Sequence, residues 1–121
     1  MQLTDKMSNM ADLDVLRKLA FSFPETVEMP HFEKTSFRVG KKIFASFDEK
    51  TDLACIKLSP VNQDLFAVFD RTIIYPVPNK WGQQGWTFVD LKRIPDEMFS
   101  DALKAAYIEV APKKLGEMIQ S

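Results

Sequence analysis

Histidine and cysteine, the side chains most readily turned to acid–base or nucleophilic chemistry, each occur once in this chain of 121 residues. His31 can act as a general base or a pH switch, and Cys55 can act as a nucleophile when a nearby base lowers its pKa. Each also has an ordinary structural use, as a surface or packing residue. Because the sequence contains no zinc-ligand spacing and no phosphate-binding glycine fingerprint, we predict a binding protein without catalytic residues, metal or cofactor, rather than an enzyme.

The segment 75–87 is the part of the sequence best suited to contact a ligand. It holds both tryptophans and two of the four glycines. An indole ring can stack on a nucleic-acid base or lie under a cation, and glycine lets the backbone come close to a ligand. The alternative is that the tryptophans simply cover one face of a small sheet. The predicted contacts here are Lys80, Trp81 and Trp86, with a ligand pocket that includes His31, Gly82 and Gly85.

The charge distribution is nearly balanced overall but uneven along the chain. Sixteen basic and 17 acidic residues give a net charge of −1, which provides no general attraction to polyanions. Residues 31–58 nevertheless carry six basic and four acidic residues, and residues 71–93, which include Lys92 and Arg93, carry four basic and one acidic. Lysines in the first turn of a predicted C-terminal helix also oppose its dipole, so a nearby anion would stabilise them. The predicted anion- or nucleic-acid-binding cations are Arg38, Lys41, Lys42, Lys57, Lys80, Lys113 and Lys114.

The first half of the chain predicts one helix followed by strands. Apolar residues at helical spacing indicate a helix over about 9–22, which Pro24 ends. The period then changes to two over 27–58, and Pro30 would keep the first short strand at a sheet edge. Gly40-Lys41 is a two-residue link with glycine first, which suits a type II′ hairpin. The nearly continuous apolar run 53–58 indicates a central strand.

The second half predicts helices alternating with one more pair of strands. Ser59-Pro60 is a helix start, and its apolar face is expected to be Val61, Leu65, Val68 and Phe69. Strands at 71–75 and 86–91 should pair across the loop 76–85, and a long helix should run over 95–110 with a short one after Pro112. We therefore predict a single α+β domain over 1–121: a two-layer sandwich whose antiparallel sheet is covered mainly on one face.

Short motifs in this order resemble the MmcQ/YjbR family over residues 12–116. In the first half they are Phe23-Pro24, Glu28, His31-Phe32, Phe37-Arg38-Val39 and Lys42-Ile43-Phe44-Ala45. In the second half they are Leu58-Ser59-Pro60, Pro76-Val77-Pro78, Trp81-Gly82, Gly85-Trp86-Thr87, Ala106-Tyr107 and Val110-Ala111-Pro112-Lys113-Lys114-Leu115. The resemblance implies the order α-β(3)-α-β(2)-α, a fold similar to that of type III secretion chaperones, and DNA binding. It brings no catalytic residues with it.

Two classes of function follow from these patterns. The first is DNA binding, with the strand-side cations on phosphates and Trp81 as a stacking platform. The alternative is a protein-interaction or chaperone-like module, which would expose an apolar patch and form a homodimer, or a domain that binds a small anion. We expect no membrane association, since the longest apolar runs are far shorter than a membrane helix. A single cysteine and the lack of a secretory leader indicate the cytoplasm.

Overall fold

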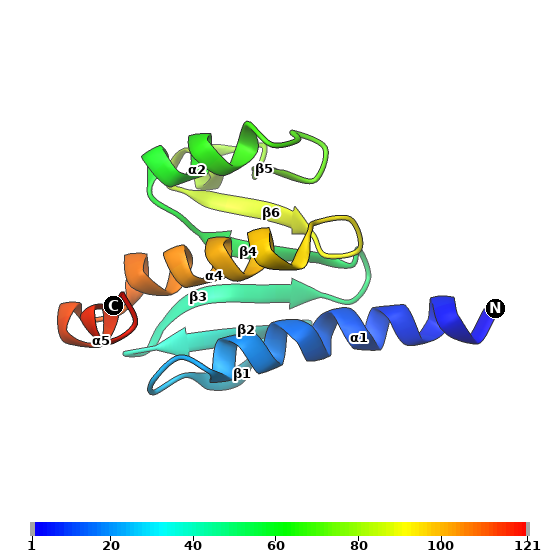
Figure 1. Ribbon diagram of the computed structural model, residues 1–121, viewed down its shortest axis with the longest axis horizontal. Helices are drawn as coiled ribbons and strands as arrows, with labels where there is room; N and C mark the ends of the chain where they lie inside the picture. Colours follow the sequence, from blue (N-terminus) through cyan, green and yellow to red (C-terminus); the bar gives the residue numbers. More distant parts are fainter. Residues whose placement is uncertain (1, 121) are drawn as a thin grey trace.

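Six antiparallel strands form one sheet, and the two longest helices lie across one of its faces (Figure 1). The computed structural model describes the backbone of residues 2–120 and the side chains of residues 12–120. The spatial order of the strands is β1-β2-β3-β4-β6-β5. The elements are α1 (Gln2–Phe21), β1 (Val27–His31), β2 (Lys34–Val39), β3 (Lys42–Asp48), β4 (Leu53–Lys57), α2 (Pro60–Ala67), β5 (Ile74–Pro76), α3 (Lys80–Gln83), β6 (Trp86–Asp90), α4 (Asp96–Val110) and α5 (Lys113–Met118).

This architecture confirms the predicted α+β class and refines the predicted order of elements. The strands β5 and β6 pair with each other, and β4 is central, as the sequence indicates. Four strands precede α2, whereas the family resemblance implies three, because β1 pairs along its whole length with β2. As predicted from Pro30, β1 lies at the edge of the sheet. The segment predicted to be a plain loop contains the short helix α3, and α1 begins earlier than position 9.

The hydrophobic core lies between the sheet and the helices α1 and α4. Ala54 and Ile56 of β4 point into it and are fully buried. The ring of Phe44 from β3 meets that of Tyr107 from α4 edge-on, with centroids 5.4 Å apart. Because side chains alternate along a strand, Cys55 and Lys57 project from the opposite side of the sheet. We call that side the open face.

The link between β2 and β3 differs from the predicted turn type. Both of its residues, Gly40 and Lys41, have positive φ, of 56° and 71°. A type II′ turn needs positive φ only at its first central residue, whereas type I′ needs it at both. The turn is therefore of the I′ kind, in which a lysine occupies a backbone conformation usually given to glycine or asparagine.

Helix α2 presents the opposite face to the one expected. Its buried residues are Gln63 and Ala67. The four apolar side chains predicted to face the core are instead between 46% and 77% exposed; they are Val61, Leu65, Val68 and Phe69. The helical period was correct, but the prediction of which side faces inward was wrong, because the buried side of α2 combines the hydrogen bonds of Gln63 with apolar packing by Phe66 and Ala67.

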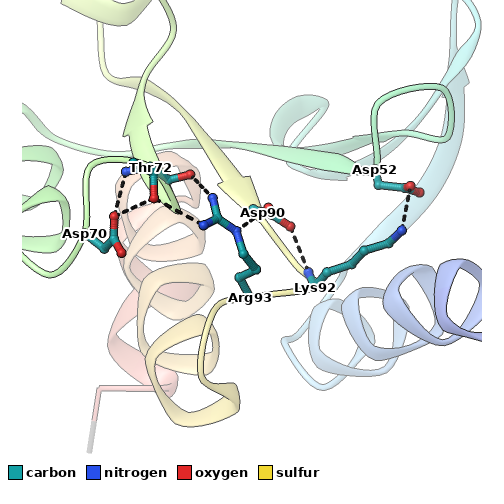
Figure 2. Close-up of polar contacts among 6 residues, drawn as sticks. All are labelled: Asp52, Asp70, Thr72, Asp90, Lys92 and Arg93. Atoms are coloured by element: carbon teal, nitrogen blue, oxygen red, sulfur yellow. Dashed lines mark hydrogen bonds and ion pairs between the residues drawn. The ribbon is translucent and has the colours of Figure 1, made fainter. Parts of the chain in front are cut away.

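A polar network fixes the Asp90 end of β6 (Figure 2). Arg93 contacts Asp90 at 2.9 Å and donates to both the side chain and the carbonyl oxygen of Thr72. Lys92 pairs with Asp52 at 3.2 Å. The positive charges of Lys92 and Arg93 are therefore paired with carboxylates of the same chain. They lie at the Asp90 end of β6, whereas Trp86 begins the strand.

Neither a membrane span nor a metal cluster is found in the described part of the chain. No helix there is both long and apolar enough to cross a bilayer. No group of three or more His, Cys, Asp or Glu side chains comes together there in a way that could hold a metal ion.

Candidate ligand-binding face

The antiparallel register lines up one row of side chains across the open face. Ser46 of β3 lies opposite Cys55 of β4, which lies opposite Phe88 of β6, which in turn lies opposite Tyr75 of β5. In the neighbouring row, Lys57 lies opposite Trp86. Because β6 is inserted between β4 and β5, residues about 30 positions apart in the sequence become direct neighbours.

An aromatic pocket of about 660 Å³ opens over the first of these rows. Its floor is the sheet, and its two sides are the β1–β2 turn and the segment that contains α3. The volume falls in the range typical of small-molecule sites, roughly 300–1,000 Å³. We call this hollow the aromatic pocket; its lining residues are His31, Phe32, Lys34, Ile43, Ser46, Cys55, Val77, Asn79, Trp81, Trp86 and Phe88.

Helix α3 brings Trp81 to the edge of the aromatic pocket. The side chain of Asn79 caps the helix by accepting a hydrogen bond of 2.8 Å from the backbone N–H of Trp81. The indole is about half exposed, and the ammonium nitrogen of Lys80 lies 5.9 Å from its centroid. A capped turn thus presents an accessible aromatic surface beside a cation, an arrangement that suits stacking on a planar anionic ligand.

The two glycines of this segment serve close packing rather than ligand contact. A Cβ atom on Gly82 would lie 1.9 Å from the carbonyl oxygen of Val77. One on Gly85, whose φ is +108°, would lie 1.9 Å from the carbonyl oxygen of Leu58. Both glycines are buried, and neither lines the aromatic pocket. Their role there is indirect, since they let the segment 82–85 pack tightly against the backbone of Leu58 and Val77.

A second hollow of about 530 Å³ adjoins the first and is strongly basic. Arg38 donates to the hydroxyl of Ser36 at 3.1 Å, and the ammonium of Lys57 donates to the carbonyl oxygen of Gln84 at 2.6 Å. These bonds direct two of the cations without neutralising them. We call this hollow the basic pocket; its lining residues are Arg38, Lys41, Lys42, Ile43, Lys57, Trp86, Glu109 and Val110.

The two pockets share a wall formed by Ile43 and Trp86. One side of that wall is lined by rings, and the other by four cations and a single carboxylate, Glu109. From these lining residues, a ligand that fits both sides would carry an aromatic group joined to an anionic group.

Burial raises the pKa of the Cys55 thiol to about 11. The thiol is therefore protonated at neutral pH, and the protonated form is a poor nucleophile. His31, the other candidate for chemistry, is the last residue of β1, and its ring centroid lies 4.8 Å from that of Phe32. Cys55 and His31 both line the aromatic pocket, together with other polar side chains.

The structure brings together only part of the predicted binding set. Arg38, Lys41, Lys42 and Lys57 converge on the basic pocket, and Trp86 joins them to Trp81. Lys80, Lys113 and Lys114 line neither pocket, although α5 starts beside the basic one, where a Cβ atom on Gly40 would lie 3.5 Å from the ring of Pro112. The sequence prediction omitted several lining residues: Phe32, Lys34, Ile43, Ser46, Phe88 and Glu109. Period-two alternation with Trp86 could have indicated Phe88, but the others depend on strand order.

Comparison with known proteins identifies related sequences and a related fold. A family model described as YjbR matches residues 21–108. The crystal structure of Deinococcus radiodurans protein DR2400, a DUF419 domain, superposes with a TM-score of 0.72 at 23% identity, covering 88% of this chain and 86% of that one. At this identity the likeness concerns the fold. No curated protein matches the chain.

Proposed function

The chain belongs to the YjbR family, and we propose that it binds DNA through the basic pocket. The observation that carries the proposal is the convergence of Arg38, Lys41, Lys42 and Lys57 on one hollow that contains a single carboxylate. Four cations in that space form a local positive site on a chain of net charge −1. Phosphate groups are the ligand that such a cluster attracts most strongly.

The geometry of the basic pocket favours contact with a polymer of phosphates over a single small anion. Its cations come from three strands, β2, β3 and β4, and from the turn between β2 and β3, and they surround an open hollow rather than one closed point. A guanidinium such as that of Arg38 can hold a phosphate through two parallel hydrogen bonds, and lysines add point charges around it. Lys113 and Lys114, next to the same turn, would extend this surface along a phosphate chain.

Salt dependence of DNA binding tests the proposal. We expect a labelled duplex to bind with a micromolar Kd at about 50 mM salt and to lose affinity by about 50- to 150-fold at 200 mM, the behaviour of three to four neutralised phosphates. The variant combines Lys41→Asn with Lys42→Gln; asparagine is chosen because it tolerates the positive φ of Lys41. It should reduce the slope of log K against log salt by about 2. Fluorescence anisotropy measures both quantities.

A matched variant controls for the loss of two positive charges. Lys18→Gln with Arg71→Gln removes the same charge from exposed residues that line neither pocket, and it should leave affinity and slope nearly unchanged. Absence of binding at about 100 µM protein in low salt, or an equal effect of the two double variants, would overturn the proposal.

A second candidate function, association with another copy of the chain, is favoured by the outward face of α2. Its exposed stripe of Val61, Leu65, Val68 and Phe69 follows helical spacing, and such patches mark interaction sites. The helix packs beside β5, a strand with one unpaired edge, so the same surface on two copies could meet about a two-fold axis. Light scattering should then show a dimer that Leu65→Glu converts to a monomer; a wild-type monomer at about 100 µM would contradict this candidate.

We propose the cytoplasm as the location of the protein. The support is chemical: Cys55 is a free thiol inside a ligand-sized pocket, and such thiols persist in reducing compartments. Fractionation of cells that express the chain, with blotting for the protein, tests this placement.

A further inference from the structure

We infer that the aromatic pocket takes one unpaired base, so that the open face binds single-stranded DNA in preference to duplex. This inference rests on the proposed function and adds to it the form of the nucleic acid. The basic pocket accounts for contacts to phosphate, and the adjoining hollow of about 660 Å³ would hold the base.

Aromatic rings reach the hollow from three separate parts of the chain. Trp81 comes from α3, Trp86 and Phe88 come from β6, and Phe32 comes from the β1–β2 turn. Phe32 is 92% exposed, and Trp81 is half exposed, so both offer ring surface that the fold itself does not use. Exposed rings around a hollow beside cations are the recurring solution for holding unstacked bases, because every base has a π-face.

Polar groups in the hollow are arranged to meet the edge of a base. Asn79, His31 and the hydroxyl of Ser46 all line it, and together they provide donors and acceptors. Lys34 adds a cation at its border. The side-chain oxygen of Asn79 already accepts from Trp81. A purely apolar ligand would leave the amide nitrogen of Asn79, the ring of His31 and the hydroxyl of Ser46 without partners, at a cost in free energy, whereas a heterocyclic base can satisfy them.

The wall shared by the two pockets links the base to its phosphate. Trp86 lines both hollows and lies directly opposite Lys57 in the sheet. A base stacked in the aromatic pocket would therefore hold its neighbouring phosphate among the cations on the other side of the wall. In a duplex the bases are paired and stacked, and extruding one costs free energy, so a duplex can use only the basic pocket.

Anisotropy with matched DNAs tests the preference for single strands. A labelled 12-nucleotide thymidine strand should bind at least about tenfold more tightly than a 12-base-pair duplex in low salt, the contribution of one stacked base. Trp81→Ala should remove that difference, and Trp81→Phe should retain most of it. Because Trp81 is half exposed, both variants should fold, which circular dichroism checks.

Cys55 provides a second readout that is confined to the aromatic pocket. It is the only cysteine, and it lines the aromatic pocket but not the basic one. The thymidine strand should slow its alkylation by iodoacetamide at least about fivefold, whereas inorganic polyphosphate at equal phosphate concentration should leave the rate nearly unchanged. Thymidine monophosphate should protect only at much higher concentration, because it lacks the further phosphates that hold the strand.

The outcomes separate the inference from the proposed function. Equal affinity for strand and duplex, with no effect of Trp81→Ala and no protection of Cys55, would overturn the unpaired-base site and leave DNA binding standing. Protection by thymidine monophosphate as strong as by the strand would also overturn it, in favour of a free nucleotide. Failure of both DNAs to bind would overturn both conclusions.

Discussion

The side-chain amide nitrogen of Gln63 lies 2.9 Å from the carbonyl oxygen of Gly82, and this bond joins α2 to α3. The same nitrogen also contacts the carbonyl oxygen of Trp86 at 3.2 Å and the hydroxyl of Thr87 at 3.1 Å. Gln63 is only 7% exposed. One buried amide therefore holds the helix that carries Trp81 against the strand that carries Trp86.

Removing this amide should destabilise the protein and weaken the aromatic pocket. Gln63→Ala removes the donor that these three acceptors share. The carbonyl oxygens of Gly82 and Trp86 keep a backbone N–H partner, but the hydroxyl oxygen of Thr87 loses its donor, and we expect a cost of about 1–3 kcal/mol of unfolding free energy. The matched change Gln83→Ala, at an exposed position of α3, should stay within about 0.5 kcal/mol. Urea denaturation followed by tryptophan fluorescence measures both, and equal effects of the two changes would contradict this role for Gln63.

The orientation of α2 shows where sequence patterns stop being informative. Apolar spacing correctly placed the helix between Ser59-Pro60 and β5, yet it pointed Leu65 and Val68 inward. In the fold, Gln63 and Ala67 face inward, because the Gln63 amide meets carbonyl groups that exist only once α3 has packed beside β6. A local pattern reports that one face differs from the other, but not which face the rest of the chain will cover.

The candidate site was predictable by residue type but not by arrangement. The sequence singled out Arg38, Lys57 and Trp86 as binding residues, and alternation along strands puts side chains on faces. Whether they share a site depends on β6 entering the sheet next to β4, which aligns Trp86 with Lys57. Strand order is a long-range property, and no local period encodes it.

Alanine substitution at two glycines should have opposite effects on stability. At Gly85 the new Cβ would meet the Leu58 carbonyl oxygen in a backbone with φ of +108°, and the strain should cost about 3 kcal/mol or more. At Gly116, inside α5, the nearest atoms belong to Ile108 at 3.8 Å or more, so alanine should stabilise by about 0.5–1 kcal/mol. Thermal unfolding compares the two, and a tolerated Gly85→Ala would refute the close approach of Gly85 to the backbone of Leu58.

The ion pair between Arg17 and Glu28 should make stability depend on pH. Two bonds of 2.7 and 2.9 Å join the guanidinium to the carboxylate and hold α1 to β1. The hydrogen bond from Arg17 lowers the pKa of Glu28 below its usual value. The contribution is therefore present above the unfolded pKa of about 4.3 and is lost as pH falls through the lower folded value.

Comparison of Glu28→Gln with wild type across pH measures this contribution. Arg17 is 37% exposed, so solvent screening limits the difference in unfolding free energy at pH 7 to about 1 kcal/mol. The difference should shrink below about pH 4.5 and vanish in stronger acid. Glu49→Gln, at an exposed site, serves as the control and should be nearly neutral throughout. A difference that does not change between pH 7 and pH 3 would show that the pair acts through packing rather than charge.

Alkylation of Cys55 should keep accelerating at a pH where an ordinary thiol has levelled off. Burial disfavours the thiolate and raises the pKa of Cys55 to about 11, whereas an unperturbed cysteine titrates near 8.5. Since only the thiolate reacts, the rate with iodoacetamide should rise about tenfold per pH unit between pH 8 and 10. The same chain unfolded in urea should approach a plateau near pH 9. A plateau below pH 9 in the folded protein would show that the pocket floor is more hydrated than its lining indicates.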